Sequence, residues 1–215
     1  MHQSSTDLKS WGSVVNDVAY GNYTERPGMI TMAQVGNGQW ITTFELAFPQ
    51  EDAINSPYAV HYKLASSPLE FGAAEPMLLR PQGVDNAHLP SAGPYVVWTP
   101  AGGVNGTVVV SDSTYDELYL NTANGDPSAW QKVGSQGHGV GYTRNLRVMP
   151  GNGGKTVLLT NGGMYGMNVT EATTGDFIVP GPGVPNFNAF ASCASKGHWG
   201  GGHGHGGGPH GHGGW

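Results

Sequence analysis

Histidines that could ligate a metal gather near one end of the chain. Five of the nine histidines lie within residues 197–215, each beside a glycine, and four of these are His203, His205, His210 and His212. Neutral imidazoles on a flexible backbone bind Cu(II), Ni(II) or Zn(II) readily. Nothing in the segment fixes a coordination geometry or outer-shell partners, so we expect metal affinity rather than a built metal centre.

Other residue types narrow the chemistry further. Cys193 is the single cysteine, which excludes an intramolecular disulfide and a cysteine-based zinc site. The formal net charge is −6, and the nine Lys and Arg residues are scattered singly. Nucleic acids and anionic membranes are bound by clustered positive charge, so we expect neither as a partner. We also expect no cofactor.

The elements that must position any site are β-hairpins. Two β-rich runs joined by a glycine turn occur three times, with the turns at residues 36–38, 102–106 and 151–154. The first two turns contain Asn37-Gly38 and Asn105-Gly106. Asn-Gly is typical of type I′ hairpin turns, in which both central residues have positive φ. The pattern therefore predicts antiparallel strands.

A second repeated feature sets the period of these hairpins. Three polar turns each lead into a large aromatic residue, at Trp11, Phe71 and Trp130. The first two aromatics are 60 residues apart and the next two are 59 apart. Four strands and an aromatic-closed turn every sixty residues are typical of a β-propeller blade. The sequence thus predicts about three four-stranded blades.

Composition supports an all-β domain. The chain has 36 Gly and 15 Pro in 215 residues, with only 11% charged residues, and shows no helical apolar stripe. We expect helix to be limited to a turn or two. Residues 1–175 form the predicted partial propeller, and residues 176–215 form a Pro/Gly-rich and then Gly/His-rich tail with too little apolar surface to order itself. We expect disorder from about residue 180.

The predicted ring is incomplete. The run His2-Gln3-Ser4-Ser5 reads as the end of a strand, and three blades leave two sheet edges exposed. The chain shows no signal peptide and no apolar run of membrane-spanning length. We therefore expect part of a larger ring that self-associates through its open edges.

Several runs resemble the fungal members of glycoside hydrolase family 93. The similarity spans about residues 2–163 in order, and it is carried by Ser5 to Gly12, Asn22 to Met29, Pro94 to Trp98 with Asn105 to Thr107, and Tyr142 to Val148. The resemblance implies a sialidase-type six-bladed propeller and a secreted, exo-acting α-1,5-arabinanase. The polar turns resemble the sialidase Asp-box, whose aromatic packs between strands. Asp7 and Trp11 fit this motif best.

The resemblance also implies the catalytic groups. Glu45 and Glu117 match the catalytic glutamates of the family, and their spacing of 72 residues, a little over one blade, would set them on neighbouring blades. In a retaining glycosidase one carboxylate attacks the anomeric carbon and the other transfers protons, with the two about 5 to 5.5 Å apart. Which glutamate is the nucleophile stays open. Asp112 and Asp116 are nearby competitors.

Five further residues are candidates for binding a furanose. Arg26 and Arg144 open inner-strand runs and could hydrogen-bond sugar hydroxyls or a carboxylate. Tyr95, Trp98 and Tyr142 could stack against a pentose, although aromatics in strands more often belong to the core.

Three functions remain open. The first is an extracellular, exo-acting arabinan hydrolase or part of one, with an oligo- or polysaccharide as its partner. The second is a carbohydrate-binding propeller fragment without turnover, and the third is an interaction module with a metal-binding tail.

Overall fold

The protein is built from antiparallel β-strands in three sheets. The computed structural model describes residues 1–18, 26–47, 56, 58–115, 117–135, 143–149, 153–154, 156–163 and 166–173. The first sheet contains β1 (Arg26–Gln34), β2 (Trp40–Ala47), β3 (Tyr58–Ala65) and β4 (Met77–Leu78). The second contains β5 (Tyr95–Thr99), β6 (Thr107–Ser111), β7 (Glu117–Asn121) and β8 (Trp130–Ser135). The third contains β9 (Thr143–Val148), β10 (Thr156–Gly163) and β11 (Gly166–Thr173).

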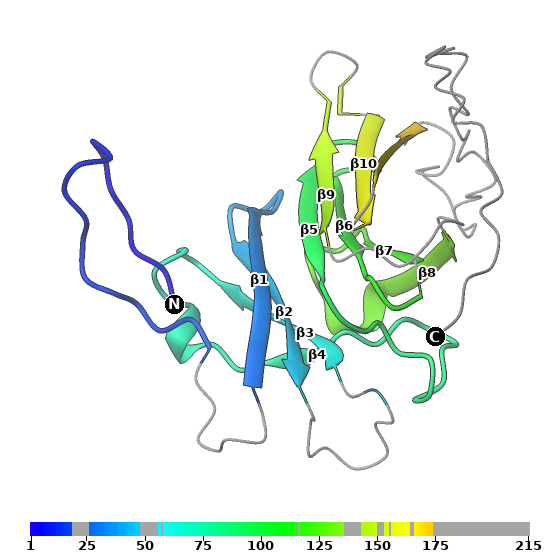
Figure 1. Cartoon of the computed structure of the whole chain (residues 1–215), viewed down its shortest axis with the longest axis horizontal. Coiled ribbons are helices and arrows are strands. Elements are labelled where there is room, and N and C mark those ends of the chain that lie inside the picture. The colour runs from blue at the N-terminus through cyan, green and yellow to red at the C-terminus, as the bar shows by residue number, and fades with distance from the viewer. Residues whose placement is uncertain are drawn as a thin grey trace, which may run out of the picture.

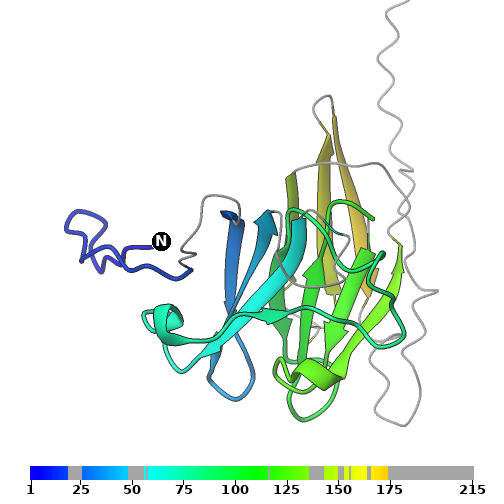
Figure 2. The same cartoon turned by 90° about the horizontal axis from the view of Figure 1, so that it is seen from below.

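Each sheet is an up-and-down meander, as in a propeller blade. The strands follow one another in chain order, and every pairing between them is antiparallel. The first strands of the three sheets lie side by side, with β1 against β5 and β5 against β9 (Figure 1). Seen from below, the sheets fan out from this inner row (Figure 2). Within the described residues, helix is limited to two 3-10 turns, Phe71–Ala73 and Pro127–Ala129. The all-β prediction is confirmed.

The second sheet has two buried faces, because it lies between the other two. On β6, Val108 and Val110 join a core shared with the first sheet, whereas Val109 joins a core shared with the third. Successive side chains of a strand point to opposite faces, so a continuous apolar run is what a strand buried on both sides requires. All five residues of β6 are buried accordingly.

The hairpins form where the Asn-Gly pairs predict them, but the expected turn type is wrong. Gly38 has φ +84° and Gly106 has φ +64°, whereas neither Asn37 nor Asn105 has a positive φ. In the first turn the N–H of Gly38 donates to the carbonyl of Val35 at 2.9 Å. Additional glycines lengthen both loops: Gly38 alone has a positive φ in the first turn, whereas Gly102, Gly103 and Gly106 all have a positive φ in the second.

The polar turns fold as expected around their acidic residues. The carboxylate of Asp7 accepts the backbone N–H groups of Lys9 and Ser10, each at 2.8 Å. Asp126 likewise accepts the N–H and hydroxyl of Ser128. These are Asx-type turns, in which a short side chain takes the place of a backbone acceptor.

The aromatics that follow the turns do not share one environment. Phe71 and Trp130 are 0% exposed, but Trp11 is 56% exposed. The expectation that Trp11 packs between strands is therefore wrong for the described residues. Residues 2–15 form a separate hairpin, bridged between His2 and Val15, that projects from the first sheet (Figure 1). The hydrogen bonds of the polar turn are local, so the turn forms even where no described strand covers the aromatic.

Three predictions concern residues outside the described part of the chain. The structure does not describe the tail beyond residue 173, so the boundary at 175, the disorder and the histidine ligands stay predictions. In the part of the chain that is described, no helix is long and apolar enough to cross a membrane.

Candidate active site

Glu45 lies on β2 opposite a gap in the neighbouring strand. Its register partner on β1 is Gly28, and a β-carbon at Gly28 would come within 2.9 Å of Glu45 Oε1. Directly after Gly28 the pairing shifts, and Met29 has φ +52°. A glycine followed by a bulge is a common way to re-aim a side chain within a sheet. The carboxylate of Glu45 therefore occupies the space where β1 has no side chain.

The loop that precedes β5 of the second sheet binds the other carboxylate oxygen of Glu45. The backbone N–H of Gly93 donates to Glu45 Oε2 at 2.8 Å. Gly93 has φ +49° and Ala92 before it has φ +59°, so the loop is in the left-handed region at two successive residues. Such a conformation is costly for Ala92 and persists only where surrounding contacts enforce it. Here it directs an N–H group of the loop before the second blade at a carboxylate of the first blade.

Asp112 connects that loop to the second glutamate. It is fully buried, and its Oδ2 accepts the N–H of Ser91 at 3.1 Å. Its Oδ1 accepts the N–H of Glu117, also at 3.1 Å. The neighbouring Ser113 donates its own N–H to the carbonyl of Ala92 at 3.0 Å. Asp112 thus fixes the loop that carries Gly93 and the start of the strand that carries Glu117.

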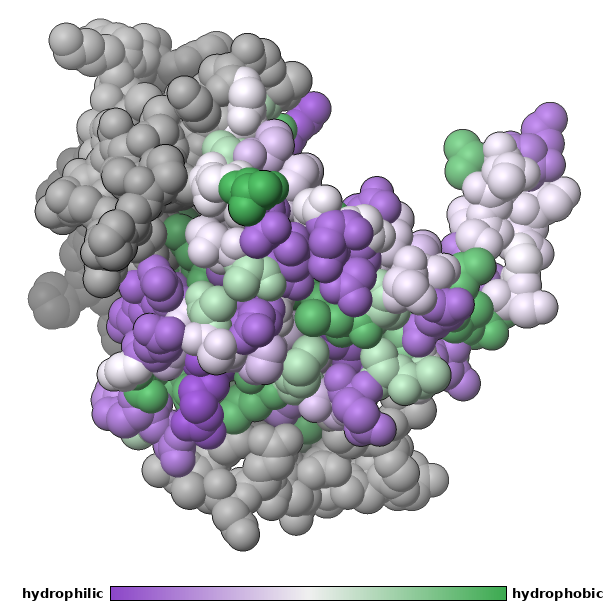
Figure 3. Space-filling view, turned by 180° about the vertical axis from the view of Figure 1, so that it is seen from behind, coloured by the Kyte–Doolittle hydropathy of each residue, from purple (hydrophilic) through white to green (hydrophobic). Residues whose placement is uncertain are grey.

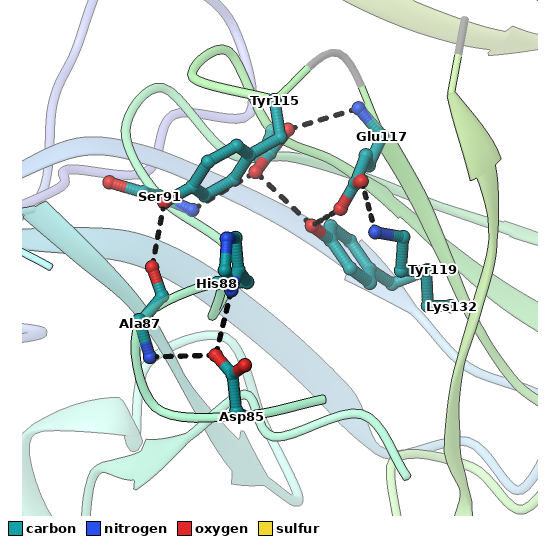
Figure 4. Close-up of polar contacts among 9 residues, drawn as sticks. Asp85, Ala87, His88, Ser91, Tyr115, Glu117, Tyr119 and Lys132 are labelled. Carbon is teal, nitrogen blue, oxygen red and sulfur yellow. Dashed lines mark hydrogen bonds and ion pairs between the residues drawn. The ribbon is translucent and has the colours of Figure 1, made fainter. Parts of the chain in front are cut away.

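Glu117 begins β7 and is almost fully buried. The hydroxyl of Tyr119 donates to Glu117 Oε2 at 2.7 Å, and Lys132 on β8 forms an ion pair with Glu117 Oε1. The same hydroxyl lies 3.2 Å from Asp112 Oδ2, so two carboxylates face one O–H group (Figure 4). Burial, together with the negative charges of Asp112 and Glu117, raises the pKa of Tyr119 well above its usual value of 10. The hydroxyl therefore remains a donor at any ordinary pH.

An exposed group of polar side chains lies beside this buried cluster. His88 Nδ1 and Asp85 Oδ1 are 2.8 Å apart, and the hydrogen bond to His88 lowers the pKa of Asp85. The ring of Tyr115 lies 6.1 Å from that of His88, and its hydroxyl donates to the carbonyl of Ala87 at 3.0 Å (Figure 4). These side chains form a polar and aromatic rim next to Glu117.

The structure therefore brings the two predicted glutamates to one junction between neighbouring blades. At this junction the N–H of Gly93 donates to Glu45, and the N–H of Glu117 donates to Asp112. The separation of 5 to 5.5 Å between their carboxyls stays a prediction. Of the competing carboxylates, Asp112 has a supporting position in this network, whereas Asp116 lies outside the described residues.

The predicted substrate-binding residues do not all lie at this junction. Tyr95 opens β5 two residues after Gly93 and is partly buried. Arg26 opens β1 and is exposed. The ring of Trp98 lies against Gly106 at the other end of β5, and its Nε1 donates to the carbonyl of Asn105 at 3.0 Å. The structure does not bring Trp98 to Glu45.

The remaining predicted site residues are less fully described. Arg144 is on β9, where only its backbone is described, and Tyr142 lies outside the described residues. Among the described residues, no group of three His, Cys, Asp or Glu side chains could hold a metal ion.

Four contributors to the site were not predicted. Gly28 and Gly93 act through a missing side chain and a backbone N–H, which no residue pattern marks. Tyr119 and Lys132 were missed although a signal existed. Tyr119 follows Glu117 by two residues on β7, and Lys132 is on the paired strand β8. Side chains two residues apart on a strand share a face.

Comparison with known proteins identifies the architecture. No family model matches the chain, and no curated protein matches it. The solved family 93 α-L-arabinofuranosidase of Fusarium graminearum, in complex with arabinobiose, aligns with 36% identity and a TM-score of 0.67 over 75% of this chain and 44% of its own. The α-L-arabinanase of Penicillium chrysogenum, also with arabinobiose, aligns with 35% identity and a TM-score of 0.70, over 80% of this chain and 49% of its own.

A more distant similarity concerns the fold alone. A family 117 glycoside hydrolase of Zobellia galactanivorans aligns with a TM-score of 0.53 at 10% identity. The chain spans less than half the length of the α-L-arabinofuranosidase and the α-L-arabinanase with which it aligns.

Proposed function

Because the chain has a glycoside hydrolase family 93-like arabinanase fold, we propose that it takes part in hydrolysing α-1,5-linked L-arabinan. The observation that carries the proposal is the junction at which Gly93 holds Glu45 and Asp112 holds the start of the Glu117 strand. A retaining glycosidase requires two carboxylates about 5 to 5.5 Å apart, and Glu45 and Glu117 are the candidates for that pair. We further propose that the enzyme acts from the chain end of its substrate and is extracellular.

The surroundings of the two glutamates indicate which one is the nucleophile and which one is the acid/base. Glu117 is paired with the ammonium of Lys132, and an ion pair requires the carboxylate form. A nucleophile must be ionised, so we assign Glu117 to attack on the anomeric carbon. Glu45 is half-buried, has a single described donor and lies in the open space at Gly28. We assign it to protonate the departing oxygen and then to take a proton from the attacking water.

The test is an assay of sugar release from linear α-1,5-arabinan, with Glu45→Gln, Glu117→Gln and the exposed-turn control Glu70→Gln. Losing either catalytic glutamate should lower turnover by about 10² to 10⁴, with the control unchanged. On a substrate whose leaving group needs no protonation, Glu45→Gln should regain activity and Glu117→Gln should not. Undiminished rates in both variants would mean that other carboxylates are catalytic, and Asp112 would be tested first.

A second function has one observation in its favour. The chain spans less than half of the enzymes it matches, so a propeller fragment that binds arabino-oligosaccharides without turnover is the alternative. Calorimetric titration with arabinobiose separates the two. Binding without sugar release by the unaltered chain supports the alternative, and release supports the hydrolase. Self-association through open sheet edges is compatible with either function.

A further inference from the structure

Two loops beside Glu117 are joined by hydrogen bonds. One loop runs from β4 to β5, and the other links β6 to β7. The N–H of Thr114 in the second loop donates to the carbonyl of Ser91 in the first at 3.1 Å. The hydroxyl of Tyr115 donates to the carbonyl of Ala87 at 3.0 Å. Binding residues commonly lie on loops that a rigid scaffold positions, and these contacts hold the two loops in place relative to Glu117.

Asp85 orients the exposed ring of His88 on the first of these loops. Its Oδ1 lies 2.8 Å from Nδ1 of His88 and accepts the backbone N–H of Ala87 at 3.0 Å. The hydrogen bond to His88 lowers the pKa of Asp85, so this carboxyl is ionised at neutral pH and can only accept. Nδ1 of His88 therefore carries the proton, and Nε2 of the neutral imidazole is an acceptor.

Tyr115 adds a second ring beside that of His88. The ring centroids are 6.1 Å apart and the ring planes are tilted by 49° (Figure 4). Burial raises the pKa of Tyr115, and the negative charges of Asp112 and Glu117 add to this effect. Charges act strongly only over short distances, so the hydroxyl of Tyr115 lies near both carboxylates. Two rings and an oriented acceptor thus meet next to Glu117.

The rim of Asp85, His88 and Tyr115 does not have the composition of a surface that docks another protein. The core of such a surface is apolar. The exposed large hydrophobic residues of the described chain all lie elsewhere, namely Met1, Leu8, Trp11, Val14, Met29, Leu69 and Val104. Several of them belong to the hairpin of residues 2–15, which projects from the body of the molecule (Figure 3). Aromatic faces beside a few oriented polar groups are typical of small-ligand sites instead.

We propose that His88 and Tyr115 form an outer subsite, which binds a further arabinofuranose unit of the chain whose reacting unit lies at the two glutamates. This subsite rests on the proposed function and adds two residues to it. The ring of Tyr115 packs against C–H groups of the sugar, and Nε2 of His88 accepts a hydrogen bond from one of its hydroxyls. Asp85 is a positioning residue, which acts through the ring of His88.

The test is calorimetric titration with arabinobiose and with arabinotetraose, in a Glu45→Gln background that lacks the proposed acid/base. We expect the disaccharide to bind at the glutamates alone, so that only the tetrasaccharide reaches the rim. Tyr115→Ala and His88→Ala should each weaken binding of the tetrasaccharide about three- to tenfold, with binding of the disaccharide unchanged. Tyr115→Phe keeps the ring and should bind both ligands as the background chain does.

Val104→Ser is the control, because Val104 is fully exposed in the turn at the opposite end of β5. It should leave both affinities unchanged, and circular dichroism of every variant separates lost binding from lost folding. Equal losses for the two ligands in Tyr115→Ala and His88→Ala, or no loss for either ligand, would overturn the subsite alone. If neither ligand binds to the background chain or to the unaltered chain, the proposed function fails and the subsite fails with it.

Discussion

The N–H of Gly93 donates to the carboxylate of Glu45 across the boundary between two blades, at 2.8 Å. Glu45 belongs to the first sheet and Gly93 to the loop that leads into the second, 48 residues later in the chain. A carboxylate held this way depends on the relative position of both blades. Blade packing and the geometry of the proposed acid/base are therefore coupled.

Gly28→Ala should disturb the carboxylate of Glu45 with little effect on the fold. A methyl group at Gly28 would come within 2.9 Å of Glu45 Oε1, and Gly28 does not have a positive φ. We expect turnover on arabinan to fall while the melting temperature changes little. Gly12→Ala is the control, because a methyl group there meets only ordinary contacts of 3.5 Å or more. Equal rates for Gly28→Ala and the unaltered chain would contradict the role given to this gap.

Tyr119→Phe should cost both stability and activity. It removes the hydroxyl that faces Asp112 and Glu117 and leaves buried carboxylate oxygens without that donor. Leaving a buried polar group unpaired costs about 1 to 3 kcal/mol of unfolding free energy. Urea denaturation measures the loss. Tyr115→Phe, which removes a more exposed hydroxyl bonded to the carbonyl of Ala87, should cost less. The opposite order would mean that the buried network does not hold Glu117.

Local signals in the sequence were sufficient for much of this fold. Alternating apolar residues and glycine turns predicted the hairpins, and the polar turns predicted the sixty-residue unit. The prediction that failed, the burial of Trp11, depends on residues far away in the chain. Trp11 and Trp130 each follow an aspartate by four residues, but only Trp130 is buried, because burial depends on what packs against the turn.

The site divides in the same way. Glu45 and Glu117 were predicted through family resemblance, whereas the loop geometry at Ala92 and Gly93 is enforced by contacts with Ser113 and Glu45, which are distant in the sequence. A backbone N–H can be contributed by any residue except proline. Its direction is therefore a property of the folded chain and is not written in a motif.

The polar turn at Asp7 should persist to unusually low pH. Hydrogen bonds from the backbone N–H groups of Ser10 and Lys9 lower the pKa of Asp7 from 3.8 to about 2. A carboxyl with a lowered folded-state pKa stabilises the fold above its unfolded pKa, and the effect is lost as the pH falls through the folded-state value. The turn should therefore loosen between about pH 3.8 and pH 2. NMR titration of the Asp7 carboxyl, with Asp7→Asn as reference, measures this, and a midpoint near 3.8 would contradict it.

Lys63→Met should separate the hairpin from the first blade. Lys63 is buried, and its ammonium donates to the carbonyls of Asp17 at 2.9 Å and Phe71 at 3.0 Å. Methionine keeps most of the side-chain volume but leaves both carbonyls without this donor. We expect a loss of about 1 to 3 kcal/mol in unfolding free energy. Faster proteolysis within residues 1–18 should accompany it.

The pH dependence of this variant tests the same contact independently. Burial lowers the pKa of Lys63, so the unfolded chain binds its proton more tightly than the folded chain does. Unfolding free energy should therefore rise with pH between the lowered folded-state pKa and the ordinary value of 10.5, because unfolding then takes up a proton. The neutral amine still has two N–H donors for two carbonyls, so the contact survives deprotonation. Urea midpoints measured from pH 7 to pH 10 should increase in the unaltered chain relative to Lys63→Met, and parallel profiles would show that the amine is not buried as described.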